Sequence, residues 1–344
     1  MKKVSIFSII IITILNIFSA DISANTTNIK PIRAGVLLYD EDDYYISEVR
    51  DYLLKIENEN KETINFIFYD ADRNQELQNK QIDELINMKV DLILLNIVDI
   101  HQSDPIINKI KAHNIPVIFF NREPSSLNGI KSYEKSLYIG TEACESGEIQ
   151  GGMIINEMKS GNIKDMNGNG ILDYVLLQGD KDNIEAQLRS ECVIRFLNES
   201  GIKTNEIAAE VCNWEKECAK QKIESLFDKY GDNIEVIISN NDDMAIGAVL
   251  ALQEKGYNLG DPNKFISVVG IGGTNEVREM IKKGFMTGTV LQDAEEKAKV
   301  LYRIALNLAQ GKEALQDTDY EFDVTGVGVR IPYNGYIIRN SPNL

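Results

Sequence analysis

Short apolar runs and amphipathic helical segments alternate along most of this chain. Up to residue 120 the apolar runs are rich in Ile, Val, Leu and Phe and lack strict polar alternation, which is typical of strands buried on both faces of a parallel sheet. The segments between them have the periodicity of helices. This order predicts an α/β fold, with a doubly wound parallel sheet covered by helices on both faces. The predicted strands are 33–39, 64–69, 91–96 and 116–120, and the predicted helices are 43–58, 74–88 and 103–113.

The same pattern begins again after residue 121. A chain of 344 residues is long enough for two compact domains, so we expect a second α/β lobe. The second set of predicted helices is 144–159, 185–200, 215–229 and 243–255, and the second set of predicted strands is 173–178, 234–239 and 266–271.

The N-terminus has the three-part order of a secretory signal peptide: two lysines, an apolar run over 4–18, and then small residues. The apolar run is shorter than the roughly 20 residues that span a bilayer, which makes a permanent anchor the weaker alternative. We expect residues 1–24 to be a signal peptide, cleaved after Ala20 or Ala24, and the protein to be exported.

The charge of the chain limits its partners. The net charge is −17, from 53 acidic and 36 basic residues. Phosphate binding needs clustered Lys and Arg, so nucleic acid is not an expected partner. The sequence contains no GxSxG, HExxH or CxxC motif and no phosphate-binding glycine loop, and therefore no motif that indicates an enzyme.

The cysteines and histidines give weaker signals. Only Cys212 and Cys218 are close in sequence, while the other two cysteines lie in predicted helices. Free, partly buried thiols are the expected state, and a Cys212–Cys218 disulfide is the alternative. His101 and His113 flank one predicted helix without the spacing of a metal site or a catalytic triad, so we expect both at the surface.

Polar and aromatic residues follow several of the predicted strands. Ligand sites in open parallel sheets lie beyond the carboxyl ends of the strands. The residues there are acids, amides and aromatics, which suit an uncharged, hydroxyl-rich ligand because the oxygens accept from hydroxyl groups and the aromatic faces cover ring carbons. A sugar is the natural candidate. These segments are 39–45, 96–99, 121–124 and 239–243.

The stretch DMNGNGILD, residues 165–173, has the ligand order of an EF-hand calcium loop. Asp165, Asn167, Asn169 and Asp173 occupy four ligand positions, and a glycine holds the sixth place. The twelfth place, normally Glu, is Leu176 in a predicted strand. If the loop binds calcium, a carboxylate must come from elsewhere, and the alternative is an Asn/Gly turn that binds no ion.

From about residue 31 to its end, the chain resembles the galactose- and glucose-binding members of the type I periplasmic binding protein family, which serve bacterial sugar ABC importers and chemotaxis. The resemblance rests on long, colinear motifs. Besides the calcium loop, they are YDEDDYYISEVR (39–50), LLNIVD (94–99), FFNREPSS (119–126), YIGTEACESGEIQG (138–151), EVIISNNDDMAIGAV (235–249), GTVLQDA (288–294) and VRIPYNG (329–335).

The resemblance implies two doubly wound lobes joined by three crossings that close over a ligand by hinge motion. It places residues 29–116 and 292–329 in the N-terminal lobe, and residues 117–291 and 330–344 in the C-terminal lobe. The implied crossings lie near 116–120, 289–292 and 328–332.

The resemblance also implies a closing ligand for the calcium loop. In the family a Glu at the start of a later strand supplies the missing carboxylate, and the matching residue is Glu235. The implied structural Ca²⁺ is held by side chains and one backbone carbonyl, a mixture that calcium tolerates. The implied ligands are Asp165, Asn167, Asn169, the carbonyl of Ile171, Asp173 and Glu235.

The sugar site implied by the family is kept in part. Asp43, Asn96, Arg189, Trp214 and Asn241 match the family's ligand-contacting residue types, and Tyr45 replaces a Phe. Tyr45 and Trp214 would sandwich the sugar ring. Tyr45 as loop packing, Trp214 as a core residue and Arg189 as a surface cation are the alternatives. Four site residues differ from the family pattern: Asn183 for His, Glu185 for Asp, Gly272 for Asp and Gln292 for Asn.

The implied function is that of a periplasmic, monomeric binding protein that delivers glucose or galactose to an ABC permease, with a chemoreceptor as a second partner. Because of the four substitutions, another sugar such as a pentose, a disaccharide or a furanose is the main alternative. A secreted glycosidase using Asp43 and Glu185 and the core of a transcription regulator are weaker alternatives. The first lacks a hydrolase motif, and the second does not fit the signal peptide.

Overall fold

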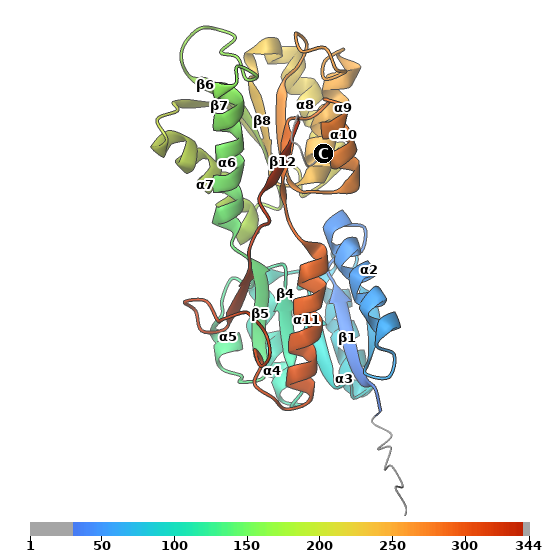
Figure 1. The fold of residues 1–344 in the computed structure, drawn as a ribbon. Helices are drawn as coiled ribbons and strands as arrows, with labels where there is room; N and C mark the ends of the chain where they lie inside the picture. Colours follow the sequence, from blue (N-terminus) through green and yellow to red (C-terminus); the bar gives the residue numbers. More distant parts are fainter. Residues whose placement is uncertain (1–29, 340–344) are drawn as a thin grey trace, which may run out of the picture.

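The computed structural model describes residues 30–339, which form two α/β lobes stacked end to end (Figure 1). The predicted signal peptide lies outside the described residues. Among residues 30–339, no helix combines the length and apolar character needed to cross a membrane. His101 and His113 are both exposed, as predicted.

The first lobe contains a six-stranded parallel sheet in the order β11-β5-β4-β3-β1-β2. Its strands are β1 (Ile32–Leu38), β2 (Ile64–Asp70), β3 (Leu92–Leu95), β4 (Val117–Phe120), β5 (Ser136–Thr141) and β11 (Gly328–Ile331). Its helices are α2 (Tyr44–Glu59), α3 (Gln75–Asn87), the short 3₁₀ helix η1 (Ile100–Gln102), α4 (Ser103–Lys111), α5 (Asn128–Lys131) and α11 (Ala294–Ala309).

The second lobe contains a six-stranded sheet in the order β12-β10-β9-β8-β6-β7, parallel except for β12, which is antiparallel to β10. Its strands are β6 (Leu172–Gln178), β7 (Thr204–Val211), β8 (Val236–Ser239), β9 (Ser267–Gly272), β10 (Gly288–Leu291) and β12 (Tyr336–Ile338). Its helices are α6 (Ala143–Lys159), α7 (Ile184–Glu199), α8 (Lys216–Tyr230), the 3₁₀ helix η2 (Gly231–Asn233), α9 (Asp242–Glu254) and α10 (Asn275–Lys282).

Each sheet is buried on both faces, as the continuous apolar runs predict. In β1, Val36 and Leu38 pack into one apolar cluster, while Leu37 between them packs into another on the opposite face. In β6, Val175 and Leu177 likewise face one cluster and Leu176 the other. The two lobes are therefore independent three-layer units, and the doubly wound α/β fold is confirmed.

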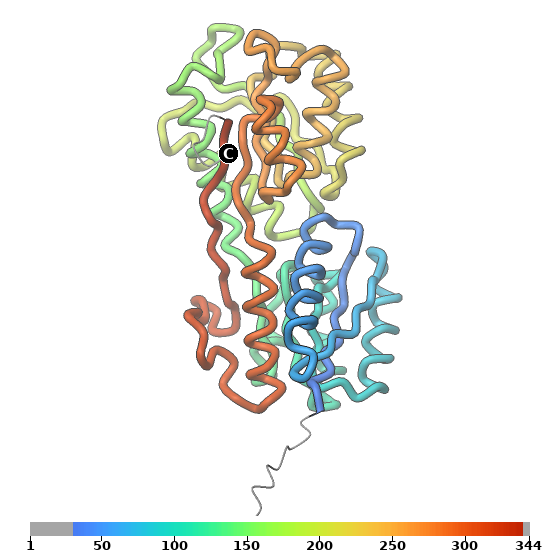
Figure 2. The backbone as a smooth tube through the Cα atoms, turned by 45° about the vertical axis from the view of Figure 1, so that its right-hand side comes forward, coloured from blue at the N-terminus to red at the C-terminus, as the bar shows by residue number. Residues whose placement is uncertain are grey.

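The first predicted crossing is wrong. Strand β4 pairs with β3 and β5 inside the first sheet, so residues 117–141 belong to the first lobe and the chain crosses between Thr141 and Ala143. The other two crossings lie between β10 and α11 and between β11 and β12. Strand β11 belongs to the first sheet, so the first lobe includes residues up to Ile331. Figure 2 shows the three connecting segments, in green, orange and red, passing between the lobes.

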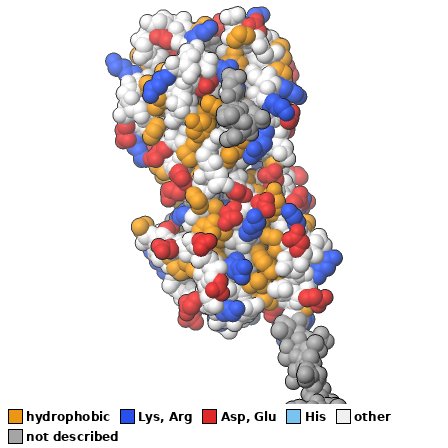
Figure 3. Space-filling view, viewed as in Figure 1, with side chains coloured by type: hydrophobic (Ala, Val, Ile, Leu, Met, Phe, Trp, Pro, Cys, Tyr) orange, Lys and Arg blue, Asp and Glu red, His pale blue; other side chains and the backbone are white. Residues whose placement is uncertain are grey.

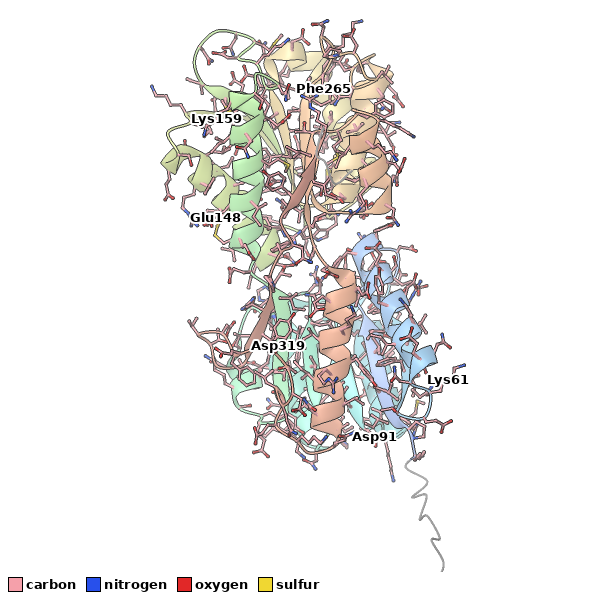
Figure 4. The ribbon with its side chains drawn as sticks, viewed as in Figure 1. Lys61, Asp91, Glu148, Lys159, Phe265 and Asp319 are labelled. Atoms are coloured by element: carbon pink, nitrogen blue, oxygen red, sulfur yellow. A yellow bond between two sulfur atoms is a disulfide. The ribbon has the colours of Figure 1, made fainter. Side chains whose placement is uncertain are left out.

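Helix α6 starts at the first crossing and runs away from the first lobe. Glu148 lies nearer the crossing and Lys159 at the far end (Figure 4). Helix α7 packs against α6, and this contact brings a cysteine of each helix together.

The expectation of free thiols is also wrong. Cys144 on α6 is bonded to Cys192 on α7, with 5.3 Å between their Cα atoms, although 48 residues separate them in sequence. Cys212 is bonded to Cys218, with 5.4 Å between their Cα atoms. The first bridge depends on the packing of two helices, which sequence proximity does not reveal.

Candidate functional site

A cleft lies between the two lobes, where the carboxyl ends of the strands of both sheets meet. Its empty volume is about 620 Å³, including the solvent at its open mouth. Figure 3 shows charged side chains gathered at the waist between the lobes. Nine of the ten predicted ligand residues line this cleft: Asp43, Tyr45, Asn183, Glu185, Arg189, Trp214, Asn241, Gly272 and Gln292.

Asp43 and Tyr45 come from the start of α2 in the first lobe. Asp43 caps this helix, since its Oδ1 accepts from the Ile46 N–H at 3.0 Å and its Oδ2 accepts from the Tyr39 hydroxyl. Burial raises the pKa of the Asp43 carboxyl. The Tyr45 hydroxyl is buried without a hydrogen-bond partner in the protein, so it is free to bond a ligand.

Arg189 lies on α7 in the second lobe and is held in place by three hydrogen bonds. One guanidinium nitrogen donates to the Asn240 carbonyl at 2.7 Å, and another donates to the Tyr333 hydroxyl at 3.0 Å and to the Gln292 side-chain oxygen at 3.3 Å. Its side chain is only 4% exposed, so the alternative of a surface cation is wrong.

Asn183 and Glu185 flank the start of α7. Asn183 caps the helix, with its Oδ1 accepting from the Ala186 N–H at 3.0 Å. Glu185 accepts from the Thr141 hydroxyl and lies 3.7 Å from Arg189. Thr141 is the last residue before the first crossing, so Glu185 connects the cleft to the hinge.

The backbone around Trp214 is shaped to hold the indole ring in the cleft. Asn213 and Trp214 have φ values of 50° and 72°, a left-handed conformation that non-glycine residues adopt at a cost. Gly179 makes room for the ring, because a Cβ there would lie 2.3 Å from a Trp214 carbon. The Asn241 side chain donates to the Trp214 carbonyl at 3.1 Å. Tyr45 and Trp214 therefore face the cleft from opposite lobes.

Asn96 does not line the cleft. Its side chain is fully buried and spans three strand ends of the first sheet. Its Oδ1 accepts from the Tyr39 N–H at 3.3 Å and its Nδ2 donates to the Phe120 carbonyl at 3.1 Å. Both of its polar groups are thus bonded to the backbone. Asn96 therefore holds the strand ends of the first lobe in place and does not contact a ligand in the cleft.

Gly272, the last residue of β9, makes room for a carboxylate from helix α9. Its φ is 153°, and a Cβ would lie 2.8 Å from Asp242 Oδ2. Asp242 accepts from the N–H groups of Gly273 and Thr274 at 2.7 and 2.8 Å and from the Thr289 hydroxyl at 2.6 Å. Asp242 is therefore committed to fixing the turn after β9 and strand β10, and sequence reasoning did not name it.

Other cleft residues lie in or near segments that the sequence indicates at strand ends, but were not predicted individually. Arg122 stacks on Tyr39, with 4.8 Å between the guanidinium carbon and the ring centre, and bonds Asp180 of the second lobe at 2.9 Å. The remaining unpredicted lining residues are Tyr44, Glu48, Asn121, Asp242, Asp243, Ile271 and Thr274.

Two carboxylates interact across the cleft. Burial, together with the charge of Asp43 in the first lobe, raises the pKa of Asp243 in the second lobe to about 7, although Lys216 partly offsets the increase. Carboxylate oxygens have several acceptor sites, so both groups can accept hydrogen bonds from hydroxyl groups of a ligand.

The predicted calcium loop lies at a different place in the second lobe. Gly168 and Gly170 both have a φ of 72°, which a tight loop needs. The Asp165 carboxylate accepts from the N–H groups of both glycines at 2.7 Å. Glu235 lies against the loop, as the resemblance implies, accepting from the N–H groups of Met166 at 2.7 Å and Asp173 at 3.1 Å.

The oxygens around this loop are of the kinds that calcium prefers. Burial raises the pKa of Glu235, and the charges of Asp165 and Asp173 contribute to the increase, so the three carboxylates lie near one another. The Asn167 and Asn169 amides bond Asp173 at 2.7 and 3.4 Å. Within residues 30–339, no three His, Cys, Asp or Glu side chains converge closely enough to hold a metal ion by themselves. Amide and carbonyl oxygens such as that of Ile171 would have to complete the coordination.

Comparisons with known proteins agree with this architecture. The chain is 36% identical over 339 residues, 97% of each chain, to the D-galactose/methyl-galactoside binding periplasmic protein MglB of Haemophilus influenzae. It is 27% identical over 237 residues, covering 68% of this chain and 71% of the relative, to a putative rhizopine-binding protein of Rhizobium meliloti.

Solved structures share the fold. A solute-binding protein of Bacillus halodurans with bound myo-inositol superposes with a TM-score of 0.73 at 24% identity, covering 91% of this chain and 96% of that one. One from Actinobacillus succinogenes with bound D-allose has a TM-score of 0.75 at 20% identity, covering 90% and 98%. Residues 34–313 match the family model described as a periplasmic binding protein domain. The chain therefore belongs to the periplasmic binding protein family.

Proposed function

We propose that this protein binds a monosaccharide between its two lobes in the periplasm and delivers it to the permease of an ABC importer. The observation that carries the proposal is the cleft itself, in which Tyr45 and Trp214 face each other from opposite lobes beside a rim of acids, amides and Arg189. Aromatic faces cover sugar carbons, and the polar rim bonds sugar hydroxyls. The protein is a binding protein and not an enzyme.

The relatives support a sugar or polyol ligand but differ in which one. Their names specify D-galactose or methyl-galactoside, rhizopine, xylitol, ribose and D-apiose. The relative with the highest identity among these binds galactosides, which favours a pyranose of glucose or galactose type. Gly272 and Gln292 replace polar residues that the family pattern has at the rim of the cleft. A sugar other than glucose or galactose is therefore the main alternative ligand.

Ligand binding and lobe closure are coupled in this proposal. Residues from both lobes contact the same ligand, so the ligand binds the closed arrangement more tightly than the open one and shifts the population toward it. Hinge closure of this kind is a known mode of periplasmic binding proteins. The closed surface is then the one that the permease recognises.

A thermal-shift screen of the mature, calcium-loaded protein tests the proposal. The panel contains hexoses, pentoses, disaccharides and sugar acids, and calorimetry follows for each compound that raises the Tm. A saturable shift with at least one monosaccharide supports the proposal. No shift with any sugar, together with a shift for an amino acid or peptide panel, would refute it.

We further propose that the loop 165–173 and Glu235 hold a structural Ca²⁺. The support is the set of oxygens and the proximity of three carboxylates, whose mutual repulsion a divalent cation relieves. Such an ion would tie the start of β6 to β8. Removing calcium with a chelator should lower the Tm of the wild type but not of Glu235→Gln, which removes one carboxylate. Equal Tm values with and without calcium for the wild type would count against the ion.

A further inference from the structure

The buried polar atoms that lack partners at the cleft are mostly hydrogen-bond donors. Within residues 30–339 they are Arg122 Nε, Arg189 Nε, Gln292 Nε2 and the Tyr45 hydroxyl, all from residues that line the cleft. Three of these four can only donate, as can Lys297 Nζ, which lies behind the cleft and also lacks a partner, while the unpartnered side-chain oxygens of Gln81 and Gln150 belong to residues outside the cleft lining. A ligand that complements them must present acceptors, because a buried donor without a partner costs free energy.

Lys297 is the most unusual member of this set. It lies in the first turn of α11, at the second crossing, and is 1% exposed. Burial lowers its pKa to about 8, and its charge interacts with those of Glu185, Arg189 and Arg330. It does not line the cleft but lies behind the cleft residues at the hinge.

The charges around Lys297 do not balance. Arg330 is already paired with Glu123 at 2.6 Å and Asp323 at 2.7 Å. Among the described residues, Glu185 is the acid whose charge acts on both Arg189 and Lys297. This hinge end of the cleft, which we call the floor and define by Glu185, Arg189, Gln292 and Lys297, therefore carries one more buried positive charge than negative. An uncompensated buried charge is costly.

The other end of the cleft has the opposite character. Asp43, which accepts a hydrogen bond from the Tyr39 hydroxyl, and Asp243 lie there, and the charge of Asp43 contributes to the raised pKa of Asp243. Tyr45 interacts with Glu185 and Arg189 of the floor. A ligand that reaches from one end to the other should offer hydroxyl groups to the acids and an anionic group to the floor.

We propose that the ligand is a sugar acid of the hexuronate class, whose carboxylate lies at the floor and whose ring lies between Tyr45 and Trp214. This inference rests on the proposed function and narrows its ligand. The carboxylate accepts from Arg189 Nε and Gln292 Nε2, and the charge of Lys297 beneath them strengthens its binding. The ring hydroxyls donate to Asp43 and Asp243. A neutral hexose fills the same space but leaves the floor with its surplus charge.

Calorimetry on the wild-type protein compares D-galacturonate and D-glucuronate with D-galactose, D-glucose and D-galactosamine. We expect one hexuronate to bind roughly 10- to 100-fold more tightly than its neutral parent, as for a hydrogen-bonded charge. Equal or tighter binding of the neutral hexose, or a preference for the amino sugar, would overturn the hexuronate assignment while leaving the proposed function intact. No binding of any of the five, with binding of a non-sugar, would overturn both.

A pair of variants on one helix tests the part played by the floor. Lys297→Met removes the buried charge at nearly constant length, and Lys299→Met removes the exposed charge two residues later, which is paired with Glu295. We expect Lys297→Met to reduce the preference for hexuronate over neutral hexose about tenfold or more, and Lys299→Met to leave it unchanged. Equal preferences in wild type and Lys297→Met would overturn the role of Lys297. Lys297→Arg, which keeps the charge, provides a second test if the Met variant does not fold.

Discussion

Trp214 shows how a single side chain depends on the residues around it. Its ring occupies the space that a Cβ at Gly179 would need, and its own backbone has a positive φ. We therefore predict that Gly179→Ala displaces the indole and costs about 1–3 kcal/mol of stability, as for an overpacked site. Because the displaced indole no longer covers the sugar ring, the affinity for the sugar should also fall.

Gly152→Ala provides the matched control for this prediction. Gly152 is in α6, and the nearest atom to a Cβ there is 4.0 Å away. This change should leave ligand affinity unaltered and, because alanine favours helices, slightly raise the Tm. Calorimetry and thermal unfolding of both variants would decide the matter, and equal affinities would show that Gly179 does not position Trp214.

Asp243 should make the ligand-free protein less stable as pH rises. Its pKa is raised from 3.8 to about 7, so the folded state binds this proton more tightly than the unfolded state. Stability from this group is therefore full below pH 3.8 and is lost as pH rises toward 7. We predict that Asp243→Asn has a higher Tm than the wild type at pH 8, by roughly 2–4 °C for each 1 kcal/mol regained, and no advantage at pH 4.

The exposed Asp42 provides the control for this titration. Asp42→Asn should show the same change in Tm between pH 4 and pH 8 as the wild type. If the Tm of Asp243→Asn differed from that of the wild type by the same amount at every pH from 4 to 8, the prediction that the pKa of Asp243 is raised would be wrong.

The sequence could predict most cleft residues but not their surroundings. Tyr45, Arg189 and Trp214 stand in motifs long enough to locate them in the cleft. Asn96 stands in such a motif too, yet the backbone uses both of its polar groups. Lys297 was not predicted because a lysine between EE and AK in a helix normally points to solvent, and its burial depends on the packing of α11 at the hinge.

At the scale of elements, the sequence located strands with continuous apolar runs and missed the others. Strand β5, with the sequence SLYIGT, is completely buried but has Ser, Gly and Thr among its residues. Strand β7 is an edge strand with exposed polar residues. The boundary after residue 116 that the resemblance implied left β4 and β5 out of the first lobe, whose sheet contains both strands.

The disulfide between helices α6 and α7 should contribute more stability than the local one. Cys144 and Cys192 are 48 residues apart, while Cys212 and Cys218 are six apart. On the loop-entropy account these separations correspond to about 4 and about 2 kcal/mol. We predict that Cys144→Ser with Cys192→Ser lowers the Tm more than Cys212→Ser with Cys218→Ser. Thermal unfolding of the two double variants would test this, and a larger loss from the local pair would contradict the loop-entropy account.

At the scale of the whole molecule, two ion pairs join the lobes beside the cleft. Arg122 and Asp180 lie 2.9 Å apart, with the Arg122 side chain 8% exposed. Arg73 pairs with Glu215, and both side chains are at least 40% exposed. Exposed pairs contribute little, while an opened partly buried pair leaves Arg122 with one fewer acceptor. The Arg122 pair should therefore favour the closed state more than the Arg73 pair does.

This difference yields a prediction about affinity at a residue that does not line the cleft. Asp180→Asn should weaken sugar binding severalfold, because the closed state loses an interlobe ion pair while the ligand contacts stay in place. Glu215→Gln should change affinity by less than about fivefold, the equivalent of 1 kcal/mol. Calorimetry gives the affinities, and small-angle scattering without ligand should show a more open average shape for Asp180→Asn. Unchanged affinity and shape in Asp180→Asn would mean that closure depends on the ligand and the hinge alone.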